Sequence, residues 1–304
     1  MNKPAIPAHF RVADNFMGLY CLLHGGVIWL GSSQLALWLF QFDSLPSVLR
    51  IVLCGGLAVV AGMGMFMLGS LGHEGFHGNL NRNRYVSMLL GILASTAVPT
   101  FCSVGLNVYH WRHHARTNTE HDPDFKLYAG RRTFLGKSAG PLRTSAHCLS
   151  NTVKLLRRGE KIDRGFPFGA STMQCFAWFN VGVVLLVTAA WTYLLICQPL
   201  AFMFFLALPA LVGQVYWTLH PYIEHADTGT THHDNARDCT SPALGFLLLG
   251  YTYHHCHHLY PNVPAYRLPA LRRHLERTGY LDGAPVQRTL FGALWIGMTG
   301  VLRT

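Results

Sequence analysis

Four apolar stretches restrict the fold of this 304-residue chain more than any other feature. They cover residues 16–40, 48–72, 175–197 and 200–219. Each is long enough for a helix that crosses a bilayer, which needs roughly 20 apolar residues. Only helices and closed barrels satisfy all their backbone hydrogen bonds inside lipid. The sequence therefore predicts an all-α membrane protein with four transmembrane helices.

The spacing of the stretches predicts two helical hairpins. Residues 41–46 form a short turn between the first two stretches, and Gln198-Pro199 separates the last two. A further apolar run, residues 86–106, is interrupted by Pro99. Because proline breaks a membrane helix locally, we interpret this run as a re-entrant or interfacial segment.

Charge placement predicts which parts of the chain face the cytoplasm. Of the 24 Lys and Arg residues, 14 lie in residues 73–172, which is the bias typical of cytoplasmic loops. We expect residues 73–172 and 220–304 to form a cytoplasmic helical cap, with residues 290–302 on the membrane surface. The chain, residues 1–304, is interpreted as a single domain in a bacterial inner membrane.

The overall composition also supports a membrane protein. Charged residues make up 12% of the chain, against about 25% in soluble proteins. The net charge of +10 is confined to the predicted cytoplasmic side, so we expect a membrane surface as partner and no nucleic acid. The eight cysteines contain no Cys-x-x-Cys pair, which argues against thiolate metal sites.

Nine of the 18 histidines are candidate metal ligands: eight fall into three short clusters beside the apolar stretches, and the ninth, His225, follows a glutamate. They are His73, His77, His110, His113, His114, His225, His254, His257 and His258. Imidazoles spaced three or four residues apart share one face of a helix. Nine exceed the about four ligands of one tetrahedral zinc, so the set predicts two metal ions.

Three motifs carry a resemblance to a known family. Residues 73–78 read His-Glu-Gly-Phe-His-Gly, residues 110–114 read His-Trp-Arg-His-His, and residues 253–261 read Tyr-His-His-Cys-His-His-Leu-Tyr-Pro. Asn-Thr at 118–119 and Asp-Pro-Asp at 122–124 extend the second motif. With these motifs the chain resembles the integral-membrane fatty acid desaturase superfamily, which also contains alkane hydroxylases, acyl hydroxylases and carotenoid ketolases.

The resemblance implies a centre of two iron ions held by the nine histidines, with O2 as co-substrate and a fatty acyl or lipid substrate. It favours desaturation, the introduction of a C=C bond, and leaves open a hydroxylase, a ketolase or an alkene-forming fatty acid decarboxylase. No haem-binding or iron–sulfur motif appears in the sequence. A separate electron donor is therefore expected, such as ferredoxin with its reductase.

Several other residues are candidates for supporting roles. Five acids are candidates either to orient the imidazoles by hydrogen bonds or to be solvated loop acids: Glu74, Asp122, Asp124, Asp227 and Asp234. Four arginines are candidates to bind an acyl headgroup or a donor protein: Arg82, Arg84, Arg112 and Arg116. His232 and His233 are interpreted as supporting or surface residues, and Cys256 as either a spacer or an altered support of the third motif.

Two functions of other classes remain open at the level of sequence. His73, Glu74 and His77 fit His-Glu-x-x-His, the pattern of a zinc protease in which the glutamate acts as base. That reading would leave the other histidine clusters without a role. A metal transporter is the second alternative, but transporters place their ligands near the middle of the bilayer, whereas these clusters lie at the ends of the apolar stretches.

Overall fold

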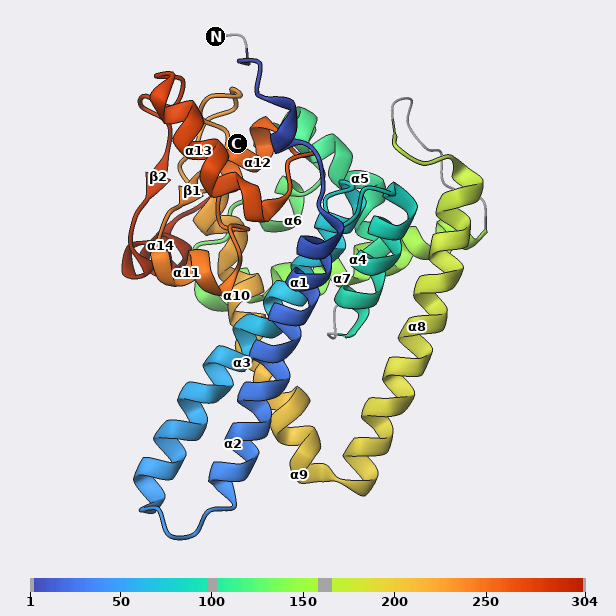
Figure 1. Cartoon of the computed structure of the whole chain (residues 1–304), viewed down its shortest axis with the longest axis vertical. Coiled ribbons are helices and arrows are strands. Elements are labelled where there is room, and N and C mark those ends of the chain that lie inside the picture. The colour runs from blue at the N-terminus through green and yellow to red at the C-terminus, as the bar shows by residue number, and fades with distance from the viewer. Residues whose placement is uncertain (1–2, 98–102, 158–165, 303–304) are drawn as a thin grey trace.

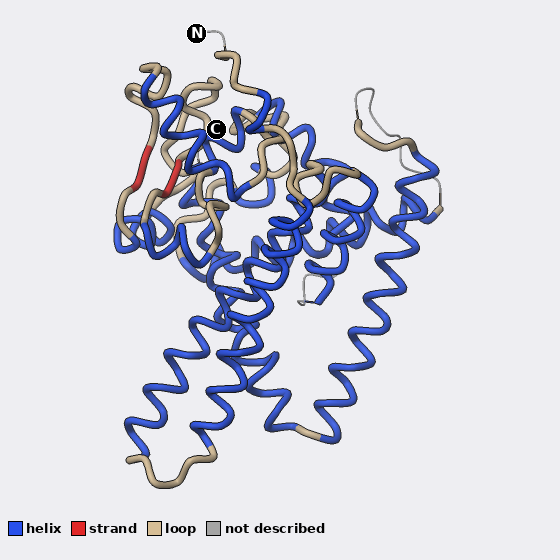
Figure 2. Tube along the Cα trace, in the orientation of Figure 1, coloured by secondary structure: helices blue, strands red, loops and turns tan. Residues whose placement is uncertain are grey.

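A computed structural model describes residues 3–97, 103–157 and 166–302 (Figure 1). Within these residues the fold is almost entirely helical, with one pair of short parallel strands (Figure 2). The first half contains η1 (Ala8–Phe10), α1 (Asn15–Gly26), η2 (Val27–Gly31), α2 (Ser32–Phe40), α3 (Ser47–Phe76), α4 (Arg84–Ala97), α5 (Ser103–Arg116), α6 (Phe125–Tyr128) and α7 (Phe134–Leu156). The second half contains α8 (Ala170–Cys197), α9 (Pro199–Phe202), η3 (Met203–Ala207), α10 (Leu208–His225), β1 (Asp238–Cys239), α11 (Pro242–Leu247), α12 (His254–Leu259), η4 (Ala265–Arg267), α13 (Leu268–Arg277), β2 (Val286–Gln287) and α14 (Leu290–Thr299).

Four helical segments of the described chain are long and apolar enough to cross a membrane. They are Ala8–Phe40, Ser47–Phe76, Ala170–Cys197 and Pro199–His225, and each contains one of the four predicted stretches. Large apolar side chains point outward along them; Leu186 of α8 is 73% exposed. Such exposure suits lipid and is costly in water. The length, composition and exposure of these helices fit an integral membrane protein.

The turns between the long helices lie together at one end of the molecule. Residues 41–46, between α2 and α3, and Gln198, between α8 and α9, both lie at the bottom of Figure 1. The shorter helices α12 and α13 lie at the opposite end (Figure 1). Helix α3 packs against α1, α2 and α10, so three of the four candidate spans meet along it.

Two π-helical turns, η2 and η3, interrupt the first and the last of these segments. A π turn disturbs the regular pairing of backbone groups, which is expensive in lipid unless another donor compensates. The indole Nε1 of Trp29 in η2 donates a hydrogen bond to the carbonyl oxygen of Phe205 in η3, at 2.7 Å. This hydrogen bond joins the two irregular turns across the helix interface and gives the Phe205 carbonyl a donor.

Close contact between α3 and α4 fixes the end of α3. A Cβ added at Gly75 would lie 2.7 Å from the Cα of Gly91, so the two backbones touch where both residues are glycine. Ser87 Oγ of α4 also donates to the carbonyl of Gly75, at 3.1 Å. The break that the sequence predicts at Pro99 lies outside the described residues, and the re-entrant or interfacial role of residues 86–106 stays a prediction.

Helix α7 is the main element that the sequence analysis did not resolve, because it lies in a region interpreted only as polar and basic. Thr133 caps its N-terminus, with Oγ1 accepting a hydrogen bond from the Gly136 amide at 3.1 Å. The helix packs against α5, α8 and α10. It thereby joins the second histidine cluster to two of the candidate spans.

The residues after α10 form a small separate core around α12 and α13. Leu259 of α12 and Leu271 and Leu275 of α13 are fully buried there, together with Phe10 from the N-terminal segment. Strands β1 and β2 pair in parallel beside this core. Helix α12 turns Leu259 toward α13, and His254, His257 and His258 face the histidines of α3, α5 and α10.

Candidate metal centre

The nine predicted histidines come from four helices that meet at one end of the molecule. His73 and His77 lie at the end of α3, His225 ends α10, and the remaining six belong to α5 and α12. All nine side chains fall into two groups within which the ligand nitrogen atoms are at most 4.8 Å apart. The groups are His73, His77, His110, His114 and His257, and His113, His225, His254 and His258.

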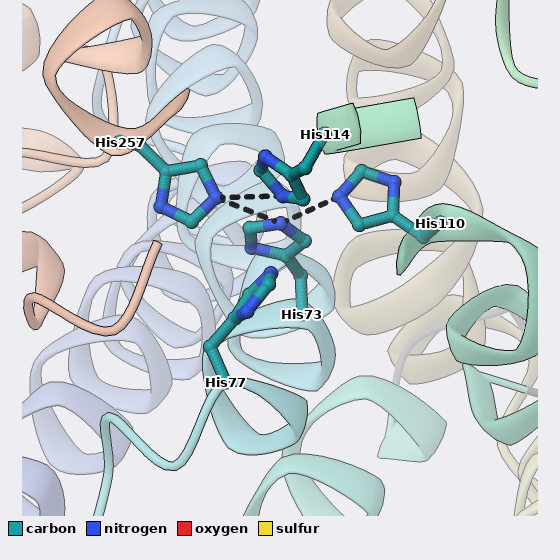
Figure 3. A group of neighbouring side chains, drawn as sticks. All are labelled: His73, His77, His110, His114 and His257. Atoms are coloured by element: carbon teal, nitrogen blue, oxygen red, sulfur yellow. Dashed lines mark hydrogen bonds between the residues drawn. The ribbon is translucent and has the colours of Figure 1, made fainter. Parts of the chain in front are cut away.

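The first group contains five imidazoles from three helices (Figure 3). Nε2 of His73 lies 2.8 Å from Nε2 of His110 and 3.1 Å from Nε2 of His257. Nε2 of His257 lies 3.3 Å from Nε2 of His114. The His77 ring stands against these rings, with its centroid 4.6 Å from that of His73. Five rings therefore direct nitrogen atoms into one small volume.

The second group contains four buried imidazoles from α5, α10 and α12. Nε2 of His254 lies 3.0 Å from Nε2 of His225 and 2.9 Å from Nε2 of His258. The ring of His113 completes the group, with its centroid 4.8 Å from that of His258. Sequence neighbours are thus divided between the groups: His113 and His114 belong to different ones, as do His257 and His258.

The hydrogen-bond partners of the second group fix where its imidazole protons lie. The Asn235 carbonyl accepts from Nδ1 of His225, at 3.0 Å. The Thr117 hydroxyl donates its one proton to the His113 carbonyl at 2.8 Å, so it accepts from Nδ1 of His258 at 3.1 Å. His225 and His258 therefore both present a bare lone pair at Nε2.

His254 lies between these two lone pairs and cannot donate to both. Glu224 Oε1 lies 3.1 Å from its Nδ1, and a carboxylate oxygen at this distance favours the proton on Nδ1. Three Nε2 lone pairs then face one another at 2.9–3.0 Å, which is repulsive unless a cation lies among them. Metal–nitrogen bonds of about 2.0–2.1 Å place neighbouring ligand atoms at about 2.9–3.4 Å, so the four residues fit a metal ion.

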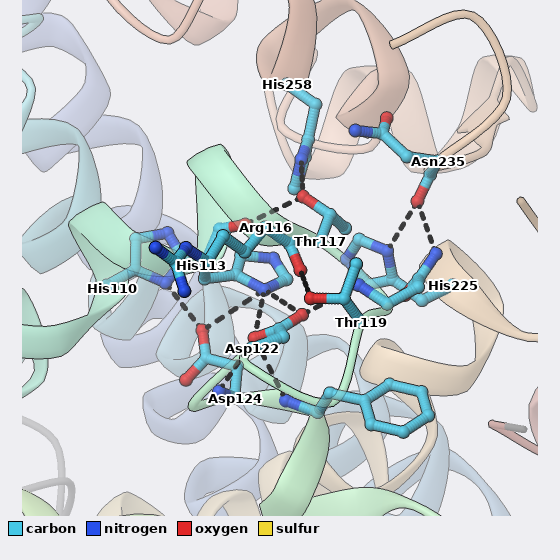
Figure 4. A network of polar contacts seen from close by, with 12 residues as sticks. His110, His113, Arg116, Thr117, Thr119, Asp122, Asp124, His225, Asn235 and His258 are labelled. Carbon is cyan, nitrogen blue, oxygen red and sulfur yellow. Dashed lines mark hydrogen bonds and ion pairs between the residues drawn. The ribbon is translucent and has the colours of Figure 1, made fainter. Parts of the chain in front are cut away.

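Asp122 and Asp124 hold two imidazoles of α5 from the loop that follows it (Figure 4). His113 Nδ1 donates to the Asp122 carboxylate at 2.9 Å, and His110 Nδ1 donates to Asp124 Oδ2 at 2.7 Å. Asp122 also accepts from the Asn118 amide at 2.9 Å, where φ is +61°. The loop thus turns back and orients one imidazole of each group.

Burial and charge together set the protonation of the imidazoles outside the long helices. Burial, followed by the charge of neighbouring imidazoles, holds the pKa of His114, His257 and His258 well below the usual value. Burial also lowers the pKa of His113, but the hydrogen bond and charge of Asp122 outweigh it and raise that pKa. The three rings with depressed pKa stay neutral at pH 7, which keeps their lone pairs free for a metal.

We expect Asp122→Asn to weaken metal binding by the four-histidine group about 10- to 100-fold. An amide replaces one acceptor oxygen by a donor, so it cannot both orient His113 and accept the loop amides. Iron content after titration with a chelator measures this. Asp234→Asn is the matched control, because Asp234 accepts from Thr231 in an exposed loop. Equal iron retention by both variants would contradict the role of Asp122.

The other three candidate acids are Glu74, Asp227 and Asp234, and their contacts differ from those of Asp122 and Asp124. Glu74 lies 3.6 Å from Nδ1 of His73 but accepts hydrogen bonds from Asn79 and from the amide of Ala265, so it chiefly joins α3 to the cap. Asp227 is exposed, and neither it nor Asp234 contacts an imidazole within the described part of the chain. These last two acids therefore fit the alternative of loop acids that the sequence left open.

The sequence analysis missed three groups that hold imidazoles. They are Thr117, Glu224 and the backbone carbonyl of Asn235. Glu224 directly precedes His225 and lies four residues after His220, whose Nε2 is 2.7 Å from its Oε1. This i, i+4 spacing was a usable signal for Glu224, whereas a backbone carbonyl leaves no signature in the sequence.

The other singled-out residues lie outside both histidine groups. His232 is exposed and His233 half-buried. Cys256 is buried, and its thiol contacts Asp238 at 3.1 Å, which forms an ion pair with Arg272. Cys256 therefore links α12 to Asp238 of β1. Arg82, Arg84, Arg112 and Arg116 are all exposed, and their binding of a headgroup or donor stays a prediction.

A cavity of about 380 Å³ lies directly beside both groups. Five of the histidines contribute to its wall: His73, His110, His113, His225 and His254. Its other walls come from α3, α5, α7 and α10, with apolar side chains such as Phe66, Leu106 and Trp217. An apolar molecule in this cavity would therefore contact the candidate metal centre.

Comparison with known proteins agrees with this geometry. The model of the fatty acid desaturase family matches residues 50–289. A fatty acid conjugase of Calendula officinalis, FAC2 A, is 22% identical over 95% of this chain and 86% of its own length. Beta-carotene ketolases of two Paracoccus strains are each 25% identical, over 81% and 87% of this chain and 88% and 97% of their own lengths.

The family match covers well over half of the chain and includes all three histidine motifs, so the chain belongs to the fatty acid desaturase family. The resemblance predicted from the motifs is confirmed. Membership makes the chain an oxidoreductase of this superfamily. The low identity to each relative leaves its particular reaction to be proposed.

Proposed function

We propose that this chain is an O2-dependent di-iron oxidoreductase that acts on a fatty acyl chain as a desaturase. The observation that carries the proposal is the convergence of nine imidazoles in two groups beside an apolar cavity, in a member of the desaturase family. Each group would hold one iron ion. The bound irons would supply the activation of O2 and the oxidising power that removes hydrogen from an unactivated methylene.

The residues of the chain would bind and orient the reactants. Asp122, Asp124 and Thr117 accept the Nδ1 protons of His113, His110 and His258, and the Glu224 carboxylate lies beside Nδ1 of His254. The Nε2 lone pairs of these four rings would therefore stay directed at the irons. The buried walls of the cavity exclude water and hold the acyl chain against the centre. In the overall reaction two hydrogens leave adjacent methylenes as a C=C bond forms. These two hydrogens, one O2, two further protons and two electrons from a donor become two waters.

The relatives name a second candidate reaction. Two of them are beta-carotene ketolases, so oxygen insertion into a C–H bond is the alternative that the comparisons favour. The ligand set is compatible with either outcome, because the result depends on how the substrate sits within about an ångström of the centre. Hydroxylation and alkene-forming decarboxylation remain further alternatives within the superfamily.

We place the active site on the cytoplasmic side of a bacterial inner membrane. The support is the concentration of 14 of the 24 Lys and Arg residues in residues 73–172. With this orientation the two pairs of long helices form hairpins, and the histidine helices form a cytoplasmic cap. A soluble donor such as ferredoxin, with its reductase, would reach the exposed Arg112 and Arg116 on that side.

The zinc protease alternative gains no support from the geometry. Its proposed base, Glu74, accepts hydrogen bonds from Asn79 and Ala265. His73 and His77 also lie among three further imidazoles, more than the three protein ligands of a catalytic zinc. The transporter alternative is weakened because all nine histidines lie at the ends of long helices or beyond them.

The test is to express the chain with ferredoxin and ferredoxin reductase, and to analyse cellular lipids and hydrocarbons by mass spectrometry. We expect a new C=C bond in acyl chains and two irons per purified chain. New hydroxyl or keto groups would select oxygen insertion, and terminal alkenes one carbon shorter would select decarboxylation. One zinc per chain with unchanged lipids would overturn the proposal.

A further inference from the structure

Helix α7 carries an apolar stripe on its outer face. Leu135, Leu142 and Leu149 are 82%, 68% and 54% exposed, and their spacing of seven residues places them on one side of the helix. The other side is buried in the protein, with Pro141 and Cys148 at its centre. Three leucines so exposed would be unfavourable in water, so this face has a partner of apolar character.

Helix α14 has a similar face. Phe291, Trp295 and Met298 are 78%, 62% and 44% exposed, while Ala293 and Gly297 are buried against the protein. Gly297 lies so close to α10 that an added Cβ would be 3.0 Å from the Cβ of Leu219. Exposed tryptophan and phenylalanine beside apolar residues are typical of helices that lie in the membrane interface.

A buried lysine joins the two helices. Nζ of Lys137, in α7, donates to the carbonyls of Gly297, Met298 and Gly300 at 2.7–2.9 Å. These carbonyls end α14, and the negative end of a helix favours a cation. The ammonium also lies 4.2 Å from the centre of the Tyr222 ring of α10. Lys137 forms no ion pair within the described residues, so it links α7, α10 and the C-terminal segment through carbonyls and a ring.

The joined segments form one wall of the cavity. Thr144 and Ser145 of α7 line it, as does Leu302, whose carbonyl accepts from the Gly130 amide at 3.0 Å. Ala210 of α10 also lines the cavity. The next residue, Leu211, is 66% exposed on the outer surface of the same helix. Helix α10 therefore borders the cavity on one side and the apolar outer surface on the other.

We propose that α7 and α14 lie in the membrane interface, and that the substrate enters the cavity from the bilayer through the seam between α7 and α10. The exposed Arg131 and Arg132, directly before α7, are placed for lipid phosphates. An acyl chain that moved through water would expose its methylenes at a cost in free energy, whereas a lateral path keeps it in apolar surroundings. The substrate class is thus an acyl chain of a membrane lipid rather than a water-soluble thioester. This assignment rests on the proposed function.

Placement of α7 can be tested without any enzyme activity. The full chain carries Leu142→Cys or Lys154→Cys with Cys175 and Cys197 replaced by serine, and is labelled with a nitroxide in phosphatidylcholine–phosphatidylglycerol vesicles. We expect the label at position 142 to collide mainly with O2, and the label at 154, on another face of α7, to collide mainly with a nickel chelate. Equal access of the chelate to both positions would overturn the placement.

Entry through the seam is tested by Ala210→Trp, with Leu211→Trp as the matched control on the lipid side. The probes are deuterated palmitoyl phosphatidylcholine in the vesicles and added palmitoyl-CoA. We expect Ala210→Trp to lower turnover of the phospholipid chain at least roughly tenfold with unchanged iron content, and Leu211→Trp to match the original chain. Equal turnover by both variants, or turnover of palmitoyl-CoA alone, would overturn lateral entry. If neither probe reacts with the original chain, the proposed function fails, and the labelling still decides the position of α7.

Discussion

His254→Ala is expected to remove one of two irons and to lower turnover by at least about a hundredfold. His254 lies between His225 and His258, and its Nε2 is within 3.0 Å of both of theirs. Loss of this ring leaves three imidazoles in the second group. Residues that merely orient metal ligands change affinity or activity about 10- to 100-fold, so loss of a ligand has a larger effect. Iron per chain and product per iron measure the two consequences.

His233→Ala is the matched control for this variant. His233 is a half-buried histidine of the same cap and belongs to neither histidine group. We expect full iron content and unchanged turnover. The expected role of His254 is wrong if its alanine variant also retains two irons, and a loss of iron from both variants would point to general damage of the cap.

Gly105→Ala is expected to destabilise the chain strongly. A Cβ at position 105 would lie 1.9 Å from the carbonyl oxygen of Cys148, so the backbones of α5 and α7 would have to separate. Overpacking in a rigid contact costs about 1–3 kcal/mol, and a clash with backbone lies at or above the upper end. Thermal unfolding in detergent measures the loss. Because α5 carries three of the histidines, iron content should fall as well.

Gly182→Ala provides the comparison for Gly105→Ala. Gly182 lies inside α8, and an added Cβ there meets nothing within 4 Å. Alanine has a helix propensity about 1 kcal/mol better than glycine, so this variant should be as stable as the original chain or slightly more stable. Similar unfolding temperatures for the two variants would show that α5 and α7 adjust without strain.

The four candidate spans and the nine histidines were accessible from the sequence because both signals are local. A run of apolar residues and an i, i+3, i+4 spacing need no knowledge of distant contacts. The division of the nine histidines into two groups was harder to predict from the sequence. Successive residues on a helix point about 100° apart, so His113 and His114 face different groups once α5 is in place. Each group therefore draws on at least two sequence motifs.

The supporting contacts depended on long-range geometry. Asp122 and Asp124 accept hydrogen bonds from imidazoles, whereas Asp234 accepts from Thr231 of its own loop and Asp227 is exposed. Proximity in sequence gives a side chain the chance to reach an imidazole but not the direction. The apolar stripe of α7 was hidden for a related reason, since the polar residues between its leucines dominate the local composition.

By itself, the sequence determined that this chain has four helices suited to lipid, three histidine motifs and the pattern of the desaturase family. Those properties follow from hydrophobicity, helical periodicity and residue identity over short distances. Only the tertiary structure decided which imidazoles share a site, which carbonyls Lys137 joins and where the cavity meets the outer surface. Each of these depends on backbones that approach closely across tens to hundreds of residues, and packing of whole helices sets that approach.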